Sequence, residues 1–422
     1  MRRTIFFTVV LLFGAFFANE TVFAQGSPYY FLGFGDPISS SSTRMLGLSG
    51  AAVALTDGSV INQLNPAALT SIPRTSFDVG LRYAYDKAQL GSNEGVNRLF
   101  KFNGLNAAAQ LWNSAKLAIG LGLNPVTDAE AKTERIDSLG AVVHKSEGGL
   151  SQFSLGVAAR PFSALALGAR ADFLFGNIRT LTQVNFDGED VSAGLFQRDY
   201  SLSGTRATIG MQLLLDSLFP ELRGLTIGVA YSTAASLSST RRTTPVLTTL
   251  DTTIESEGAG YFPSQIRIGI AGRFGDRFRV EADIVGQDFS TAYVFAPNGT
   301  TSSGDPLLGA SNSYCFAIER LPLLGDEGRG YGFWDRAGLR LGVSYSQLPF
   351  RPAAGVTVSE MAASLGLGIP FASGSSIDLA AQMGIRTPSN TDVAPKETFF
   401  KIGTTITISE KWFVPLRKTD DE

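Results

Sequence analysis

Apolar and charged residues alternate along strand-length segments of this chain, and the pattern recurs from one segment to the next. In residues 265–274, Ile266 and Ile268 share one parity, while Arg267 and Arg273 share the other. Successive side chains of a β-strand point to opposite faces of the sheet, so each such segment predicts a strand with one apolar and one ionic face. A soluble sandwich with its charges in water would show the same local pattern. Strand number, strand length and export distinguish a membrane barrel from it.

Fourteen segments show this period. An even number places both ends of the chain on one side of the membrane, as closed bacterial outer-membrane barrels require. Most of the segments match or exceed the ~9–11 residues that cross a bilayer on a tilt. We therefore expect an all-β fold, an antiparallel transmembrane β-barrel of about 14 strands. The segments are 74–86, 100–112, 116–125, 149–160, 164–180, 199–215, 224–237, 262–274, 277–293, 312–322, 335–348, 357–370, 375–387 and 397–413.

The connections alternate in length, which gives the direction of the first strand. Tight turns such as Gly275-Asp276 belong on the periplasmic side of such barrels, so the first strand should run outward. The long connections are expected to be outer loops. They are 87–99, 126–148, 181–198, 238–261 and 294–311.

The face of each strand follows from its parity. Phe77, Val79 and Leu81 should meet lipid, and Asp78 and Arg82 should point inward. Charges of both signs would then line the lumen, where each can find a partner or water. On the lipid side, a mid-membrane arginine costs ~2–4 kcal/mol.

The first 24 residues predict export. Arg2 and Arg3 precede an apolar run over residues 5–18, and small residues lead to a cleavage site after Ala24. This pattern is typical of a secretory signal peptide, because the run is shorter than the ~20 apolar residues of a spanning helix. A membrane anchor is the alternative. With the barrel pattern, the signal predicts a Gram-negative outer membrane, with its lipid as a partner.

Residues 25–73 do not follow the strand pattern. They are rich in Gly, Ser and Ala, and Pro66 would remove a ladder hydrogen bond from any strand. Met45–Leu55 is too apolar for a free tail and must pack against something, for which the barrel lumen is the available surface. We expect an N-terminal hatch at 25–73, a barrel at 74–413 and a C-terminal tail at 414–422.

Two motifs in this region resemble the long-chain fatty acid transport porin (FadL-type) family. One is the small-residue run Arg44–Asp57, and the other is Asn65-Pro66-Ala67-Ala68-Leu69, just before the first strand. Residues 396–413 are also similar to the closing strand of such proteins, although the tail beyond Phe413 departs from chains that stop at the terminal aromatic residue. The resemblance implies a fourteen-stranded barrel with a hatch in its lumen.

The resemblance implies two functions. The first is an outer-membrane channel for hydrophobic or amphipathic small molecules such as long-chain fatty acids. The second, suggested by PorV-type relatives, is an interaction subunit of a protein secretion system. In the hatch, Asn65, Pro66 and Ala67 are the candidate residues, because the Asn65 amide can bridge hatch and lumen or merely start an Asx-turn.

The other candidate site is a set of arginines at strand positions that are expected to face the lumen. They either form an ion-paired lining that holds the hatch or bind a carboxylate head group, since guanidinium pairs with carboxylate bidentately. The candidates are Arg267, Arg273, Arg277, Arg336 and Arg340.

The sequence argues against other classes of function. The single histidine, His144, falls in the expected loop 126–148 without the partners of a catalytic triad, so we predict no enzyme. Neither metal-ligand spacing nor a phosphate-binding loop is present, so no cofactor is expected. The net charge of −3 argues against nucleic acid as a partner, and the lone Cys315 excludes an intramolecular disulfide.

Overall fold

The computed structural model describes most of the chain. The expected signal peptide, and Phe413 with the tail after it, lie outside the described residues. Among the residues described, no helix has both the length and the apolar character to span a membrane. The described ranges are 27–38, 42–91, 93–112, 115–137, 140–186, 194–219, 221–247, 250–251, 253–300, 302–323, 332–372 and 374–410.

The described strands form one closed antiparallel sheet and a two-stranded sheet, β1–β5. Helices are few and short: η1 (Pro28–Phe31), α2 (Thr43–Gly47), η2 (Pro66–Ser71), η3 (Leu215–Ser217) and α3 (Phe333–Arg336). The small sheet pairs β1 (Asp36–Pro37) with β5 (Thr127–Asp128). The closed sheet contains β2 (Thr75–Leu90), β3 (Asn93–Trp112), β4 (Leu117–Pro125), β6 (Ala131–Asp137), β7 (Gly140–Phe162), β8 (Leu165–Phe186), β9 (Gly194–Leu214), β10 (Thr226–Ser232), β11 (Ala235–Leu247), β12 (Leu250–Asp251), β13 (Ile254–Phe262), β14 (Gln265–Phe274), β15 (Phe278–Asp288), β16 (Tyr293–Pro297), β17 (Ala310–Arg320), β18 (Gly338–Gln347), β19 (Val358–Ala372), β20 (Ser375–Pro388) and β21 (Lys396–Glu410).

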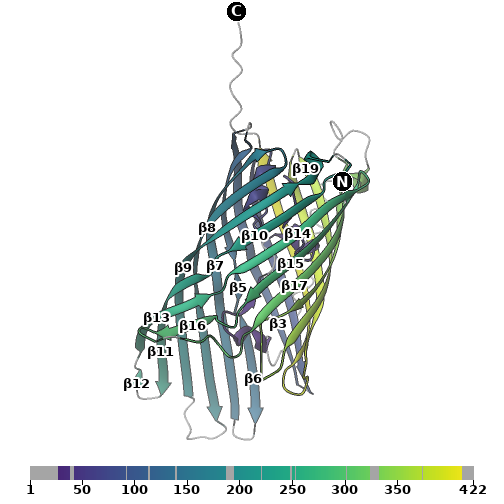
Figure 1. Cartoon of the computed structure of the whole chain (residues 1–422). Coiled ribbons are helices and arrows are strands. Elements are labelled where there is room, and N and C mark those ends of the chain that lie inside the picture. The colour runs from purple at the N-terminus through teal and green to yellow at the C-terminus, as the bar shows by residue number, and fades with distance from the viewer. Residues whose placement is uncertain are drawn as a thin grey trace, which may run out of the picture.

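These elements make a barrel of fourteen strands (Figure 1). Four strands are interrupted, so that β4 with β6, β10 with β11, β13 with β14 and β15 with β16 each cross as one. The barrel closes where β21 pairs with β2, from Thr75 opposite Glu410 to Gln89 opposite Lys396. The prediction of a fourteen-stranded antiparallel barrel is confirmed.

The parity of the strands places charge inside and apolar side chains outside, as predicted. Leu341 and Met383 are 60% and 62% exposed on the outer surface, whereas Arg340 and Asp378 on the same strands are 4% and 2% exposed. Because an unpaired backbone group in lipid costs several kcal/mol, a closed sheet with an apolar outer band fits a bilayer. The barrel is an outer-membrane protein.

Most of the expected outer loops are instead continuations of the strands. The prediction was wrong for 87–99, 181–198 and 238–261, where the hairpins β2–β3, β8–β9 and β11–β13 continue to within a few residues of their tips. Beyond the membrane neither face is lipid-exposed, so the apolar alternation fades although the ladder continues. The wall therefore extends further on the side of β7 to β13, as the lower ends of β11, β12 and β13 show in Figure 1, and we call this part of the wall the outer extension.

We expect the folded barrel to resist dissociation in detergent. An unheated sample should migrate faster in a denaturing gel than a boiled one, because backbone ladders hold the neighbouring wall strands together in one closed sheet. Solubility without detergent, or identical mobility before and after heating, would contradict the membrane barrel.

Candidate functional site

The described N-terminal segment, residues 27–74, is enclosed by the wall, where it lies in purple among the strands of Figure 1. Its polar contacts are with inward-facing side chains. Ser364 of β19 donates a hydrogen bond to the carbonyl oxygen of Gly47 at 3.0 Å, and the hydroxyl of Thr405 in β21 donates to that of Thr43 at 2.8 Å. The segment therefore contacts the barrel from within.

Glycines in the wall allow the backbone of this segment to approach closely. A Cβ atom at Gly228 would lie 2.4 Å from the carbonyl oxygen of Val53, and one at Gly342 would lie 2.6 Å from the carbonyl carbon of Leu48. At Gly168 the same atom would lie 2.4 Å from the backbone of Pro66. Backbone thus meets the wall directly at β8, β10 and β18.

Two wall side chains also hydrogen-bond to the segment's backbone. One carboxylate oxygen of Asp283 in β15 accepts from the amides of Ala52 and Val53, at 2.7 and 2.9 Å. From β9, the amide of Gln212 donates to the carbonyl oxygens of Val53 and Leu55, both at 3.1 Å. These bonds satisfy buried backbone groups of a stretch that has no regular secondary structure.

The Asn65-Pro66-Ala67 motif is a fully buried turn against β9. The side-chain oxygen of Asn65 accepts from the Ala67 amide at 3.0 Å and caps η2, in which Pro66 is the first residue. Its side-chain nitrogen donates to the carbonyl oxygens of Val53 and of Met211 in β9, at 2.9 and 3.1 Å. Asn65 thus forms the Asx-turn and also joins two parts of the segment to the wall.

A buried ionic network joins helix α2 to the wall. Arg44 of α2 contacts Asp57 at 2.5 Å and Glu319 of β17 at 2.9 Å. Glu319 is 1% exposed and also binds Arg279 of β15 and, at 2.7 Å, Arg340 of β18. Three guanidinium groups therefore converge on one carboxylate. We call these five residues the lumen network.

Within the N-terminal segment, the network determines the ionisation of Asp57. Burial would raise the pKa of Asp57, but Arg44 and Arg279 outweigh it and hold this pKa well below its usual value. A carboxylate with a lowered pKa stabilises the folded state above its unfolded pKa, and it loses this effect as pH falls through the folded pKa. The contact of Arg44 with Asp57 therefore persists into mildly acidic conditions.

Two of the predicted arginines line the interior. Arg340 belongs to the lumen network and also contacts Asp378 of β20 at 2.5 Å. Arg267 of β14 is 9% exposed, and its Nε donates to Gln265 at 3.0 Å. Among the described residues, no carboxylate oxygen lies within 4.0 Å of Arg267.

The other three arginines lie at the turn end of the barrel. Arg273 is exposed near the end of β14, and Arg277 precedes β15 and contacts Asp335 at 3.3 Å. Arg336 is exposed on helix α3, since β18 begins only at Gly338 and not at residue 335 as expected. Their placement in the lumen lining is corrected accordingly.

The wall is interrupted between β3 and β6. Strand β3 pairs with β4 only over Leu105–Trp112. After Pro125 the chain bends inward, so that β5 pairs with β1 of the N-terminal segment, and β6 pairs with β7 alone. Within the described residues, the 93–104 stretch of β3 and the facing β6 share no ladder. We call this interruption the wall break.

Side chains connect the two sides of the wall break. Lys101 of β3 contacts Asp128 at 2.5 Å and Glu130 at 2.8 Å, and Asn97 donates to the Glu130 carbonyl oxygen at 3.1 Å. A cavity of about 20 Å³ lies directly behind, lined by Asp128 together with Arg82 and others from the wall and the N-terminal segment. Side-chain contacts and a nearly filled space, rather than a backbone ladder, therefore close the break.

Besides the lumen network, the lumen contains a layer of buried apolar side chains, which we call the apolar layer. It includes Tyr29 and Phe34 of the N-terminal segment, and Tyr29 stacks on Phe350 with ring centroids 5.6 Å apart. The layer is Tyr29, Phe34, Ala129, Leu150, Leu174, Ile178, Leu202, Ala235, Leu237, Phe262, Phe289, Ala292, Leu308, Leu348, Phe350, Val356, Val358 and Ala394.

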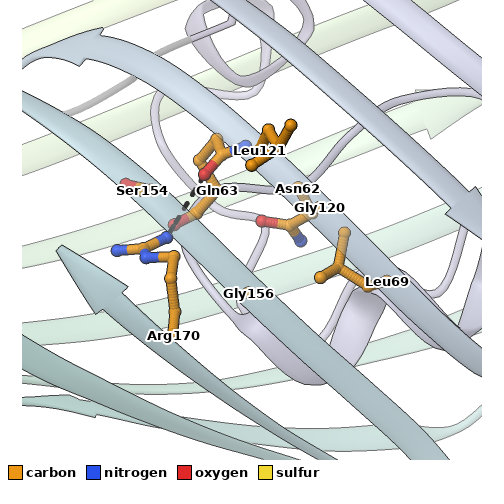
Figure 2. A pocket seen from close by; sticks show the side chains of 8 residues that line it. All are labelled: Asn62, Gln63, Leu69, Gly120, Leu121, Ser154, Gly156 and Arg170. Atoms are coloured by element: carbon orange, nitrogen blue, oxygen red, sulfur yellow. Dashed lines mark hydrogen bonds between the residues drawn. The ribbon is translucent and has the colours of Figure 1, made fainter.

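A second cavity lies where residues 62–69 contact β4, β7 and β8 (Figure 2). It measures about 10 Å³, room for a single water. Arg170 from β8 donates to the backbone oxygen and to the side-chain oxygen of Gln63 across it, and a dashed line joins the two residues in Figure 2. Here too the N-terminal segment nearly fills the lumen.

No group of metal-binding side chains occurs in the part of the chain that the structure describes. His144 lies on the hairpin extension of β7, where its Nδ1 is 3.0 Å from the hydroxyl of Thr182. The loop expected at 126–148 contains β5, β6 and the start of β7 instead.

With this geometry established, comparison with known proteins identifies the chain. The sequence model of the BamG family matches residues 1–418. The chain belongs to the BamG family. Comparison of this BamG-family sequence with curated proteins gives no match.

Solved structures share the fold of this BamG-family barrel. A FadL homologue from Pseudomonas aeruginosa matches with a TM-score of 0.62 and 13% identity, over 89% of this chain and 99% of the other. The toluene transporter TodX of Pseudomonas putida matches with a TM-score of 0.59 and 16% identity, over 90% of this chain and 99% of the other. The monoaromatic hydrocarbon channel CymD matches with a TM-score of 0.55 and 16% identity, over 92% of this chain and 98% of the other. At such identities the likeness shows the fold, a FadL-type outer-membrane barrel.

Proposed function

We propose that this BamG-family barrel is a channel for hydrophobic and amphipathic small molecules such as long-chain fatty acids. The wall break carries the proposal, because a closed ladder would separate lumen from lipid on every side. An apolar molecule can pass sideways only where the ladder is absent. The matching solved structures include a toluene transporter and a monoaromatic hydrocarbon channel, which supports the same class of cargo.

In this proposal the N-terminal segment is a hatch. The pairing of its strand β1 with β5 links the segment to the wall break. The lumen network links it to the opposite wall. The cavities described above are far smaller than a hydrocarbon ligand, so passage requires the segment to move. Arg267 is a proposed contact for a carboxylate head group, because it is buried and no carboxylate oxygen of the described residues lies within 4.0 Å of it.

Cross-linking the wall break should stop passage. Cysteines replacing Lys101 and Glu130, in a Cys315→Ser background, would be joined by a short bis-maleimide. We expect uptake of a neutral hydrophobic dye to fall to the level of cells that lack the barrel, because the two sides can no longer separate.

The matched control replaces Lys87 and Glu94, which contact each other at 2.8 Å where β2 and β3 share a continuous ladder. The same linker there should leave uptake unchanged. Equal uptake with and without the link at Lys101 and Glu130 would refute lateral passage.

The second candidate is an interaction subunit of a protein secretion system. The nearly filled lumen and the tall outer extension favour it, since neither is needed by a simple pore. Purification in mild detergent separates the two proposals. A stoichiometric partner protein supports the interaction subunit, and an isolated barrel with bound lipid or hydrocarbon supports the channel.

A further inference from the structure

Two arginines on the outer extension of the wall stack on aromatic rings. The guanidinium carbon of Arg241 in β11 lies 4.2 Å from the ring centroid of Phe295 in β16. That of Arg198 in β9 lies 4.7 Å from the ring centroid of Phe196. A ring under the guanidinium plane orients the group and leaves its N–H edge available to an anion.

These side chains share the inner face of the extension. Phe196, Arg198 and Tyr200 alternate along β9, so they project to one side, and Arg241 lies opposite Tyr200 in the ladder. Tyr200 packs against the buried apolar layer, which places this side toward the lumen. We call Phe196, Arg198, Tyr200, Arg241 and Phe295 the arginine shelf.

The position of the Phe295 ring depends on a glycine of β13. A Cβ atom at Gly258 would lie 2.7 Å from the edge of that ring, so the missing side chain lets the ring lie across the strand. The ring centroids of Tyr200 and Phe295 are 6.3 Å apart, and the two rings connect the shelf to the apolar layer below.

Arginines on the two faces of the extension differ in their partners. On the outer face, Arg179 contacts Asp199 at 2.5 Å and Arg242 contacts Glu255 at 2.9 Å. Among the described residues, no carboxylate oxygen lies within 4.0 Å of either shelf arginine, and the Nε of Arg241 is buried with no hydrogen-bond partner. A buried unpaired donor is costly, and an incoming anion would satisfy it.

We propose that the arginine shelf binds the carboxylate of an amphipathic molecule whose apolar part lies against Tyr200 and the apolar layer. Guanidinium groups pair with carboxylate through parallel N–H bonds, and the shelf presents two of them beside an apolar surface. This site rests on the proposed channel function, for which it would be the point of capture on the outer side. The proposed cargo is therefore negatively charged at one end and apolar over the rest of its length.

The test measures equilibrium binding of decanoate and of decanol to the full barrel in nanodiscs of neutral lipid. Replacing both Arg198 and Arg241 with Gln should weaken decanoate binding by roughly tenfold, since bonds to charged groups are the stronger ones, and leave decanol binding unchanged. Arg179 and Arg242 replaced with Gln form the matched control, which keeps both affinities. The heat-dependent gel shift verifies that each variant is folded.

The outcomes separate the shelf from the channel. Equal losses for both ligands, or no loss in the Arg198 and Arg241 variant, would overturn the shelf while the channel stands. Failure of the unaltered barrel to bind either ligand would instead remove the channel, and the shelf with it. Replacement of both shelf arginines by Lys should retain part of the preference for decanoate, because the charge stays while the bidentate geometry is lost.

Discussion

Deletion of residues 27–64 is expected to convert a closed barrel into an ion-conducting pore in planar bilayers. Barrel diameter grows with strand number, and eight strands already leave an interior that side chains must fill. With fourteen strands the lumen is wider, and the described N-terminal segment supplies what fills it. Removing the segment exposes the charged inner faces of the wall to water.

The deletion leaves Asn65-Pro66-Ala67 and the entry into β2 in place, so the wall keeps its first strand. A heat-dependent gel shift must first establish that the shortened protein is folded. Conductance equal to that of the full chain, with the gel shift intact, would show that these residues do not obstruct the pore and would remove the hatch from the proposed function.

Replacement of Glu319 with Ala is expected to have the largest effect of any single substitution. Removing one partner of a buried ionic group costs about 3–5 kcal/mol, because the opposite charge stays buried and unpaired. Glu319 forms ion pairs with Arg44, Arg279 and Arg340. Without it, the mutual repulsion of the three guanidinium groups would add to the loss of stability. We expect the temperature of the gel shift to fall and the N-terminal segment to become accessible to protease.

Glu255→Ala is the control for this substitution. Glu255 also pairs with an arginine, Arg242, but their side chains are 52% and 61% exposed on the outer extension. Exposed pairs contribute little to stability, so its gel-shift temperature should stay close to that of the unaltered barrel. Equal behaviour of the two variants would mean that the lumen network does not hold the segment.

The barrel could be predicted from the sequence because lipid imposes a strict rule on it. Wherever a strand crosses the membrane, one face must be apolar. Neighbouring residues such as Arg340 and Leu341 therefore alternate between charged and apolar, and this alternation is visible in the sequence. The rule ends at the membrane surface. Beyond it, Arg198 and Arg241 stand on ladders as regular as those below, but the alternation no longer marks them as strands.

The candidate site could be predicted only in part, because it depends on contacts between distant residues. Asn65 was identified from its motif, since a turn is a local feature. Nothing local shows that Asp57 and Glu319 share Arg44, or that the chain after Pro125 turns inward to meet β1. The Pro125-to-Glu130 stretch could have been marked by its break in period, but its partner in the lumen could not.

The glycines at which wall and N-terminal segment touch backbone to backbone limit how a passage can form. At Gly168, Gly228 and Gly342 the wall contacts the backbone of the N-terminal segment from three strands, so the segment fits the lumen in one position. Rigid sliding of the segment along the barrel axis would drive its carbonyl groups into the neighbouring inward side chains. In the proposed channel, opening would therefore proceed by local unravelling of the segment from one end, and the melting of a few residues at a time would set its rate.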